Sequence, residues 1–531
     1  MSGAWSTANP WGCHIYPGYW ASISPDRIAQ HVADPEESLT YAELDARSRQ
    51  FAGVLSSRGV GYGDHVTVIA ENDSRYLEIA WGALLVGAYL TTVSTHSTVD
   101  DAAYIVDNSG SSVVVASHRM AEVVGGLPER LDSCKSWLMF GGVVDGFGCY
   151  EDALAVSDGF VVDSDTRLGD YMFYSSGTTG RPKGILRPLA GRTVDDGTNF
   201  DGFLSRKLGV GRDSVYLSPA PLYHSAPLAS VVAATSLGAT VVVMRKFDAE
   251  LSLRLIERYS VTHSQWVPTM FVRLLRLSPE IRGKFDLTSH SMAVHSAAPC
   301  PVHVKKDMMD WWGPIIHEYY NGTENVGATY VGPTDWLAHP GTVGRPLGFR
   351  VHVCDDDGRE LPRGQTGRIF VERDSATFAY HGDAEKTRNS RHPSHDNWMT
   401  LDDVGFVDAD GFLFLTDRAS FMIITGGVNV YPREIEDCLL RHPAVGDVGV
   451  FGVDDEEMGE RVIALVEPVD GFAPSRELHD ELRDFAYSEL AGPKRPRTIE
   501  FVERLPRTES GKLSKKDLRA DYKARNQLSQ I

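Results

Sequence analysis

The stretch YSSGTTGRPKG at residues 174–184 decides how the rest of the chain is interpreted. Glycines let a backbone bend sharply and approach a ligand closely. The hydroxyl groups and exposed amides of such a loop donate to phosphate oxygens, and Lys183 adds a full positive charge. The segment therefore predicts a triphosphate cradle, with a flexible polar surface loop as the alternative. The candidate nucleotide-binding residues in it are Ser175, Ser176, Gly177, Thr178, Thr179 and Lys183.

The cradle differs from the P-loop pattern GxxxxGK[ST]. Pro182 lies between Gly180 and Lys183, and no Ser or Thr follows the lysine. A P-loop nucleotidase is therefore not indicated.

Composition narrows the classes of function. A chain of 531 residues is expected to form more than one domain. Its formal net charge of −20 argues against non-specific binding to nucleic acid or to a membrane surface. The six cysteines are scattered without a CxxC pair, which indicates a reducing compartment and argues against a zinc site or a disulfide framework.

Targeting and membrane signals are weak in this sequence. The N-terminal residues lack a basic segment followed by a long apolar run, so no signal peptide is expected. The most apolar stretches, residues 79–93 and 231–244, are short and interrupted, and each predicts a buried helix that runs into a strand. We therefore expect a cytoplasmic protein without a membrane partner.

The first four hundred residues alternate between helical and strand patterns. Residues 38–60 show helical apolar spacing after a turn signal, residues 65–70 predict a buried strand, and residues 239–244 predict a strand covered on both faces. The residues YMFYSSGTTG, 171–180, predict a short strand that leads directly into the cradle. The fold class is therefore α/β, with a large multi-layer N-terminal domain of parallel or mixed sheets.

A second domain begins where the composition changes, after Asp408. The remaining residues predict strands at 445–453 and 461–469, a helix at 475–490 and a basic, proline-rich tail. This is a small α+β unit, large enough to fold alone. With the boundary near residues 417–420, the predicted domains are residues 1–417 and residues 418–531.

Five segments occur in the order and spacing of the adenylate-forming superfamily, which includes acyl-CoA synthetases, peptide-synthetase adenylation domains and luciferases. The chain resembles this family over roughly residues 35–520. The five segments are the cradle, YYNGTEN (319–325), TLDDVG (400–405), TDRASFMIITGGVNVYPREIE (416–436) and LPRTESGKLSKKDLR (505–519). The resemblance implies that residues 1–417 bind ATP and the acid and that residues 418–531 form a mobile C-terminal domain.

The resemblance also implies a nucleotide site. Glu324 offers a carboxylate that would hold Mg²⁺, and Thr323 would donate to the α-phosphate. Asp403 would accept from the ribose hydroxyls and Arg418 would reach ribose or phosphate, while Asn321 and Gly322 would complete the site. The family's usual Thr-Gly-Asp is replaced here by Leu401-Asp402-Asp403, in which Asp403 aligns best.

Lys512 is the main catalytic candidate. By resemblance it is the mobile lysine between the acid carboxylate and the α-phosphate during adenylation. Attack of a carboxylate on phosphorus builds negative charge on both partners, and a lysine between them stabilises that charge. The neighbouring Lys515 and Lys516 are expected to be solvated.

The acid pocket is expected to be apolar. His224, in PLYHSAPL (221–228), is the candidate gate between acid and pantetheine, with a hydrogen-bonded core histidine as the alternative. No aspartate in this region could pair with an amino group, which disfavours an amino-acid substrate. The predicted wall residues, some of which plain core packing would also explain, are Tyr223, His224, Trp266, Met270, Ala297, Ala298 and Pro299.

A second half-reaction would use another face of the small domain. In the family this domain rotates after adenylation and brings a pantetheine tunnel to the site. The residues that match the tunnel segment are Gly426, Gly427 and Tyr431, and Ser420 occupies the hinge position, where Asp or Lys is usual.

The predicted enzyme is an acid–thiol ligase. It would use ATP, Mg²⁺ and CoA to convert a hydrophobic fatty or bulky cyclic acid to its CoA thioester, as a monomer or homodimer. One alternative keeps the adenylate but transfers the acyl group to an amine or to a carrier-protein thiol. Another is a member specialised for thioesterification of an adenylate made elsewhere.

Overall fold

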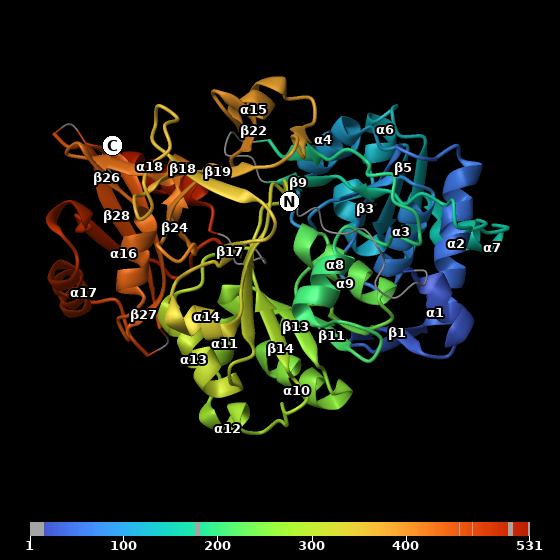
Figure 1. Ribbon diagram of the computed structural model, residues 1–531, viewed down its shortest axis with the longest axis horizontal. Helices are drawn as coiled ribbons and strands as arrows, with labels where there is room; N and C mark the ends of the chain where they lie inside the picture. Colours follow the sequence, from blue (N-terminus) through green and yellow to red (C-terminus); the bar gives the residue numbers. More distant parts are fainter. Residues whose placement is uncertain (1–14, 176–180, 456, 470, 508–512, 529–531) are drawn as a thin grey trace.

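The computed structural model describes residues 15–175, 181–455, 457–469, 471–507 and 513–528. These residues form layered α/β structure, with a large N-terminal part and a small C-terminal unit at one end of the molecule (Figure 1). The predicted fold class is confirmed.

A nine-stranded sheet forms the base of the large part. Its strands run in the order β17-β16-β15-β14-β13-β11-β12-β1-β2, and the six from β15 to β1 are parallel while the edges are antiparallel. The strands are β1 (Ile28–Ala33), β2 (Glu37–Thr40), β11 (Val215–Ser218), β12 (Thr240–Met244), β13 (His263–Trp266), β14 (Met292–His295), β15 (Ile316–Tyr320), β16 (Thr329–Val331) and β17 (Arg345–Pro346). The helices between them are α8 (Asp201–Leu208), α9 (Ser225–Ser236), α10 (Ala249–Tyr259), α11 (Pro268–Leu275), α12 (Pro279–Arg282), α13 (Val302–Trp312) and α14 (Pro333–Ala338).

A six-stranded parallel sheet forms the second layer, in the order β7-β6-β5-β3-β4-β8. Its strands are β3 (His65–Ile69), β4 (Tyr89–Thr92), β5 (Val113–Ser117), β6 (Ser136–Phe140), β7 (Gly148–Cys149) and β8 (Asp170–Tyr171). The accompanying helices are α1 (Pro17–Ile23), α2 (Tyr41–Ser57), α3 (Arg75–Leu85), α4 (Val99–Ser109), α5 (Ala121–Val124), α6 (Leu127–Arg130) and α7 (Tyr150–Ala155).

The main core lies between these two sheets. One hydrophobic cluster contains side chains from both sheets and from α2, α3 and α9. Trp81 of α3 donates to Thr235 Oγ1 of α9 at 3.1 Å, so even the polar atom of this buried ring is satisfied. Residues 75–92 and 225–244 each form the helix and strand that the sequence predicts, with α3 leading to β4 and α9 to β12.

Two smaller sheets stand above the base. A three-stranded sheet has the order β20-β10-β9, and a second sheet has the order β21-β22-β19-β23-β24 with β18 paired to β19. Their elements are β9 (Phe173–Ser175), β10 (Lys183–Leu186), β18 (Arg350–Cys354), β19 (Gly367–Glu372), β20 (Ala379–Tyr380), α15 (Ala384–Asn389), β21 (Arg391–His392), β22 (His395–Met399), β23 (Asp403–Val407) and β24 (Leu413–Arg418).

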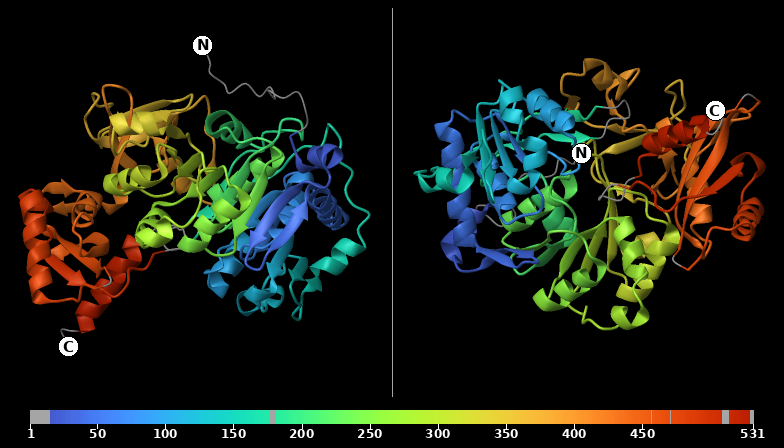
Figure 2. Two further views of the ribbon diagram at one scale, coloured as in Figure 1. Left: turned by 90° about the horizontal axis from the view of Figure 1, so that it is seen from below. Right: turned by 180° about the vertical axis from the view of Figure 1, so that it is seen from behind.

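The C-terminal unit has its own sheet and hydrophobic core. Four strands have the order β26-β25-β28-β27, and β29 pairs in parallel with β28. Figure 2 shows this unit projecting at the end of the molecule from two further directions. Its elements are β25 (Ile423–Thr425), β26 (Val428–Val430), α16 (Pro432–Leu439), β27 (Val445–Asp455), β28 (Gly459–Pro468), α17 (Arg476–Glu489), β29 (Thr498–Phe501) and α18 (Lys515–Leu528).

The structure adds local features that the sequence pattern did not predict. Residues 37–40 form β2 before helix α2, and Thr40 and Glu43 close a capping box at the start of that helix. The C-terminal tail ends in α18 rather than in irregular chain. Within the described residues, no helix combines the length and apolar character needed to span a membrane.

Candidate functional site

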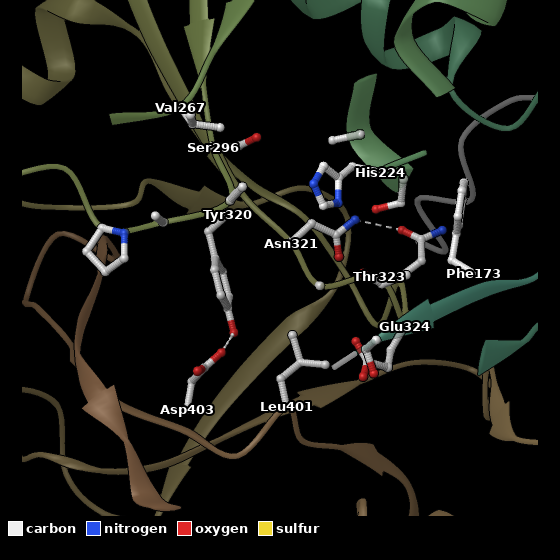
Figure 3. A pocket seen from close by; sticks show the side chains of 18 of the residues that line it. Phe173, His224, Val267, Ser296, Tyr320, Asn321, Thr323, Glu324, Leu401 and Asp403 are labelled. Carbon is white, nitrogen blue, oxygen red and sulfur yellow. Dashed lines mark hydrogen bonds between the residues drawn. The ribbon is translucent and has the colours of Figure 1, made fainter. Parts of the chain in front are cut away.

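A cavity of about 2480 Å³ lies between the large part and the C-terminal unit. Its base is formed where the parallel strands of the nine-stranded sheet end, as Val267 follows β13, Ser296 follows β14 and Asn321 follows β15. Figure 3 shows these residues facing one space together with His224, Thr323, Glu324 and Asp403. Ligands of open α/β sheets bind at this edge, so the cavity is the candidate active site.

Asp403 of the predicted nucleotide site is held by hydrogen bonds from two other side chains. It is 7% exposed at the start of β23, where it accepts a short hydrogen bond from the Tyr320 hydroxyl (Figure 3). Arg418 Nε donates to its other oxygen at 3.2 Å. Burial raises the pKa of Asp403, although the nearby Arg418 guanidinium partly opposes this. The carboxylate is thus held in place at the cavity wall.

Glu324 also lines the cavity. Its Oε1 accepts a hydrogen bond of 2.8 Å from the hydroxyl of Tyr380, which belongs to β20. Thr323, Asn321 and Gly322 also line the cavity. A carboxylate oxygen beside a phosphate-sized space is the donor that Mg²⁺ prefers, so the residues present are compatible with that ion.

Two residues near Glu324, the neutral Tyr380 and the basic Lys386, were not identified from the sequence. Tyr380 orients the carboxylate, and Lys386 of α15 places its Nζ 4.6 Å from the centre of the Tyr380 ring. Lys386 lines the cavity. No periodic or spacing signal marks either residue, because they lie in a two-residue strand and a short helix about sixty residues after Glu324.

The predicted acid pocket is largely assembled. Its wall residues, apart from one, line the cavity: Tyr223, His224, Trp266, Ala297, Ala298 and Pro299. Met270 is the exception, since it packs in the second hydrophobic cluster and is not on the cavity wall. Trp266 is fully buried and also belongs to that cluster, so it contributes to both core and wall. Ala297 has φ of 73°, a backbone conformation unusual for a residue with a side chain.

A polar strip crosses this otherwise apolar wall. Gln265 Nε2 donates to the hydroxyl of Tyr319 at 2.9 Å, and Ser296 bonds to the same hydroxyl. These three residues line the cavity. Each stands at or beside the end of a parallel strand, and that position was the signal that could have identified them.

A buried ion pair lies beneath the polar strip. Lys305 of α13 is fully buried and its Nζ lies 2.6 Å from Glu318 Oε2 on β15. His295 Nε2 lies 3.3 Å from the same oxygen. Burial alone would raise the pKa of Glu318, but the Lys305 ammonium and the His295 ring hold it at about 2. Helix α13 and strands β14 and β15 are therefore linked through Glu318, which itself lines the cavity.

The C-terminal unit presents one of its faces to the cavity. Lys515 lies 3.0 Å from Glu436 and 3.7 Å from Asp417, so the predicted solvated lysine is in fact 11% exposed and paired. Ser420, the predicted hinge residue, lines the cavity beside Arg418. Arg276 of the large part donates to the carbonyl of Gly446, which joins the two parts.

The predicted CoA-binding residues lie elsewhere. Gly426 and Gly427 form the turn between β25 and β26 with φ of 57° and 75°, and Tyr431 precedes α16. None of the three is on the cavity wall in this arrangement of the two parts.

The structure places the remaining predicted residues as follows. Ser175 lines the cavity, and Lys183 begins β10 beside Ser175 of β9. Ser176, Gly177, Thr178, Thr179 and Lys512 lie outside the described residues. Their roles, like those of the other site residues, stay predictions.

Known families and proteins match nearly the whole chain. The family model for AMP-binding enzymes matches residues 19–381, and the model for the AMP-binding enzyme C-terminal domain matches residues 434–512. The chain is 32% identical to a feruloyl-CoA synthase of Amycolatopsis sp, over 96% of this chain and 99% of the relative. It is 29% identical to the long-chain-fatty-acid–CoA ligase FadD13 of Mycobacterium tuberculosis (strain ATCC 25618 / H37Rv), over 95% and 97%.

A solved structure supports the same assignment. The amide bond synthetase McbA from Marinactinospora thermotolerans superposes with a TM-score of 0.79 at 25% identity, over 95% of this chain and 99% of that chain. The first family model alone covers more than half of the sequence. The protein therefore belongs to the AMP-binding enzymes of the adenylate-forming superfamily.

Proposed function

We propose that the protein is an ATP-dependent acyl-CoA ligase that activates a hydrophobic carboxylic acid, either a fatty acid or a bulky cyclic acid. The observation that carries this proposal is that one cavity has two chemically different ends. The nucleotide end holds Asp403, Arg418 and Glu324, whereas the other end is walled by Ala297, Ala298 and further apolar residues. An acid bound at the apolar end would present its carboxylate to the nucleotide end.

In the first half-reaction the carboxylate attacks the α-phosphorus of ATP. The acyl–oxygen bond to phosphorus forms as the bond to the β-phosphate oxygen breaks, and pyrophosphate leaves with that electron pair. Asp403 would bind the ribose hydroxyls and Thr323 would donate to the α-phosphate. Glu324, oriented by Tyr380, would hold Mg²⁺, which neutralises phosphate charge when bound.

Lys512 completes this half-reaction in our proposal. Negative charge grows on both the attacking carboxylate and the phosphate, and an ammonium between them stabilises the transition state more than the ground state. A mobile C-terminal domain is required to bring the lysine in and to remove it afterwards.

In the second half-reaction the thiol of CoA attacks the acyl carbon and AMP leaves. Gly426 and Gly427 would then line the pantetheine arm, after the C-terminal domain has rotated about Ser420. Glycine suits this position because a narrow thiol arm must pass close to the backbone. In the present arrangement the two glycines do not line the cavity, so this step would need the domain to rotate.

The class of acid is supported by the relatives and by the pocket. The two relatives are named for an aromatic acid and for long-chain fatty acids, and both classes are hydrophobic. The polar strip of Gln265, Ser296 and Tyr319 adds hydrogen-bonding groups to the apolar wall. An acid that carries an oxygen substituent on a hydrophobic framework would satisfy both parts of this wall.

A different acceptor is the second candidate. The structural similarity to an amide bond synthetase favours transfer of the acyl group to an amine as the alternative. A chain specialised for thioesterification of a supplied adenylate is the third possibility.

Pyrophosphate release tests the three functions. We would supply straight-chain, aromatic and polycyclic acids, each without an acceptor, with CoA and with an amine, and identify the product by mass. Release that rises with CoA, together with the thioester mass, supports the ligase. An amide product supports the second candidate. If no acid causes release but synthetic acyl-adenylates plus CoA yield thioester, the third is correct.

A further inference from the structure

Lys386 lines the cavity on the side of Glu324, and Lys183 comes from the strand next to β20. Lys183 begins β10, and β10 pairs with β20 through Ile185 and Tyr380. His381 N donates to Gly184 O at 2.8 Å, after which the chain turns at Gly382 and enters α15. This pairing brings Lys386 of α15 near Lys183, so that the charge of each lysine acts on the other.

Two carboxylates act on the ammonium group of Lys386, but they do not outweigh its burial and the nearby Lys183. Lys386 faces the ring of Tyr380, and the carboxylates of Glu324 and Asp383 act on it from the loop after β15 and from the start of α15. Even so, burial and the nearby Lys183 lower the pKa of Lys386 to about 8. Glu324 is in addition engaged by the hydroxyl of Tyr380.

Two adjacent ammonium groups repel each other, and folding alone would not favour keeping them together. Their proximity is explained if an anion with several negative charges binds between them. A charge-dense polyphosphate satisfies this requirement, because each lysine can donate to a different phosphate group.

We propose that Lys386 and Lys183 form a two-lysine site for the β- and γ-phosphates of ATP and for the pyrophosphate product, an inference that rests on the proposed function. When the bond between the α-phosphorus and its bridging oxygen breaks, the electron pair passes to that oxygen and charge accumulates on pyrophosphate. Two ammonium groups at this end of the nucleotide stabilise the leaving group. Lys386 is thus a phosphate-binding residue, supplied by α15 rather than by the glycine-rich segment.

The test compares Lys386→Met with the wild-type enzyme. Binding of magnesium pyrophosphate and of AMP is measured by calorimetry, and the KM for ATP is measured by adenylate formation. We expect pyrophosphate binding to weaken at least about tenfold and the KM for ATP to rise similarly, because one charge-assisted contact is lost. AMP binding and thioesterification of a supplied acyl-adenylate should change less than about twofold, since neither involves the β- and γ-phosphates.

Three variants make the result specific. Lys386→Arg keeps the charge and should retain most pyrophosphate binding. Glu385→Gln, the exposed neighbour on the same helix, and Lys284→Met, an exposed lysine away from the cavity, should bind pyrophosphate like the wild type. Thermal melting of each variant controls for folding.

Several outcomes would overturn the inference. Unchanged pyrophosphate affinity in Lys386→Met would do so, and so would equal weakening of AMP and pyrophosphate binding, which indicates a structural role. Failure to bind pyrophosphate in the wild type would also refute it. The binding assay contains neither acid nor CoA, so lysine-dependent pyrophosphate binding in an enzyme that makes no thioester would refute the proposed function and leave this site standing.

Discussion

Replacing Lys305 by methionine should strongly destabilise the large part of the protein. Lys305 is fully buried and its Nζ lies 2.6 Å from Glu318, which is 6% exposed. Removing one partner of a buried ion pair leaves an uncompensated charge, at a cost of about 3–5 kcal/mol. The shift in the pKa of Glu318 gives a similar free energy for the contribution of the ion pair to stability. Lowering it from 4.5 to about 2 corresponds to about 3 kcal/mol of stabilisation at neutral pH.

The pH dependence of this effect has a definite sign. The pKa of Glu318 is depressed in the folded protein, so its contribution is fully present above pH 4.5 and is lost as the pH falls toward 2. Without Lys305, burial would raise the pKa of Glu318 instead. The carboxylate would then oppose folding at neutral pH, and the deficit of the variant should be smaller at pH 5 than at pH 8.

Urea unfolding followed by tryptophan fluorescence measures these differences. Lys306→Met is the matched control, because Lys306 is the exposed neighbour on the same helix and should cost less than about 0.5 kcal/mol. In the double variant Lys305→Met with Glu318→Gln the buried charge is absent, so part of the stability should return. A decrease of less than about 1 kcal/mol in the free energy of unfolding of Lys305→Met would refute this account. So would a double variant whose decrease equals the sum of the decreases in the two single variants.

Three further predictions concern the two half-reactions. Lys512→Ala should lower adenylation at least about a hundredfold and spare thioesterification of a supplied acyl-adenylate, and unaltered pyrophosphate release would contradict its assignment. Gly427→Leu should block thioester formation while adenylate still accumulates, as measured by mass spectrometry; equal loss of both steps would indicate misfolding or a wrongly assigned tunnel. Asp403→Asn should raise the KM for ATP about tenfold or more, because the ribose hydroxyls lose a charged acceptor and the contacts with Tyr320 and Arg418 weaken, and a KM within twofold of wild type would argue against ribose binding.

Many of the helices and strands could be predicted because the strongest signals in the sequence are local. Continuous β-branched runs such as residues 240–244 are typical of strands that are buried on both faces, and β12 does lie between parallel β11 and β1. The pairing of strands that are distant in the sequence could not be predicted in this way. No local pattern indicates that β10 pairs with β20, almost two hundred residues later. Such contacts depend on tertiary packing, which local propensity does not encode.

The polar and charged residues of the site also fall into two groups: those that a local motif identifies and those that only the fold brings together. Glu324 and Asp403 could be identified because they stand within motifs of fixed order. Lys386, Tyr380 and Lys305 could not, since none of them stands in such a motif and only the fold brings them beside Lys183, Glu324 and Glu318. Lys515 was expected to be solvated because lysine-rich tails usually are, yet the fold places it between Asp417 and Glu436.

The reaction could be identified from the sequence more readily than the acid, and the reason is chemical. Phosphate, ribose and a cation impose the same requirements in every such enzyme, so charged and glycine residues recur at set places. The predicted acid pocket is lined instead by residues that are common in any core, such as Ala297 and Trp266, and by polar groups that a core would also have to satisfy. Only the structure shows that Gln265 and Tyr319 bond to each other on the cavity wall. Because their hydrogen-bonding groups are already paired, an acid with a suitably placed oxygen must compete with that bond, which favours acids whose polar group reaches both residues at once.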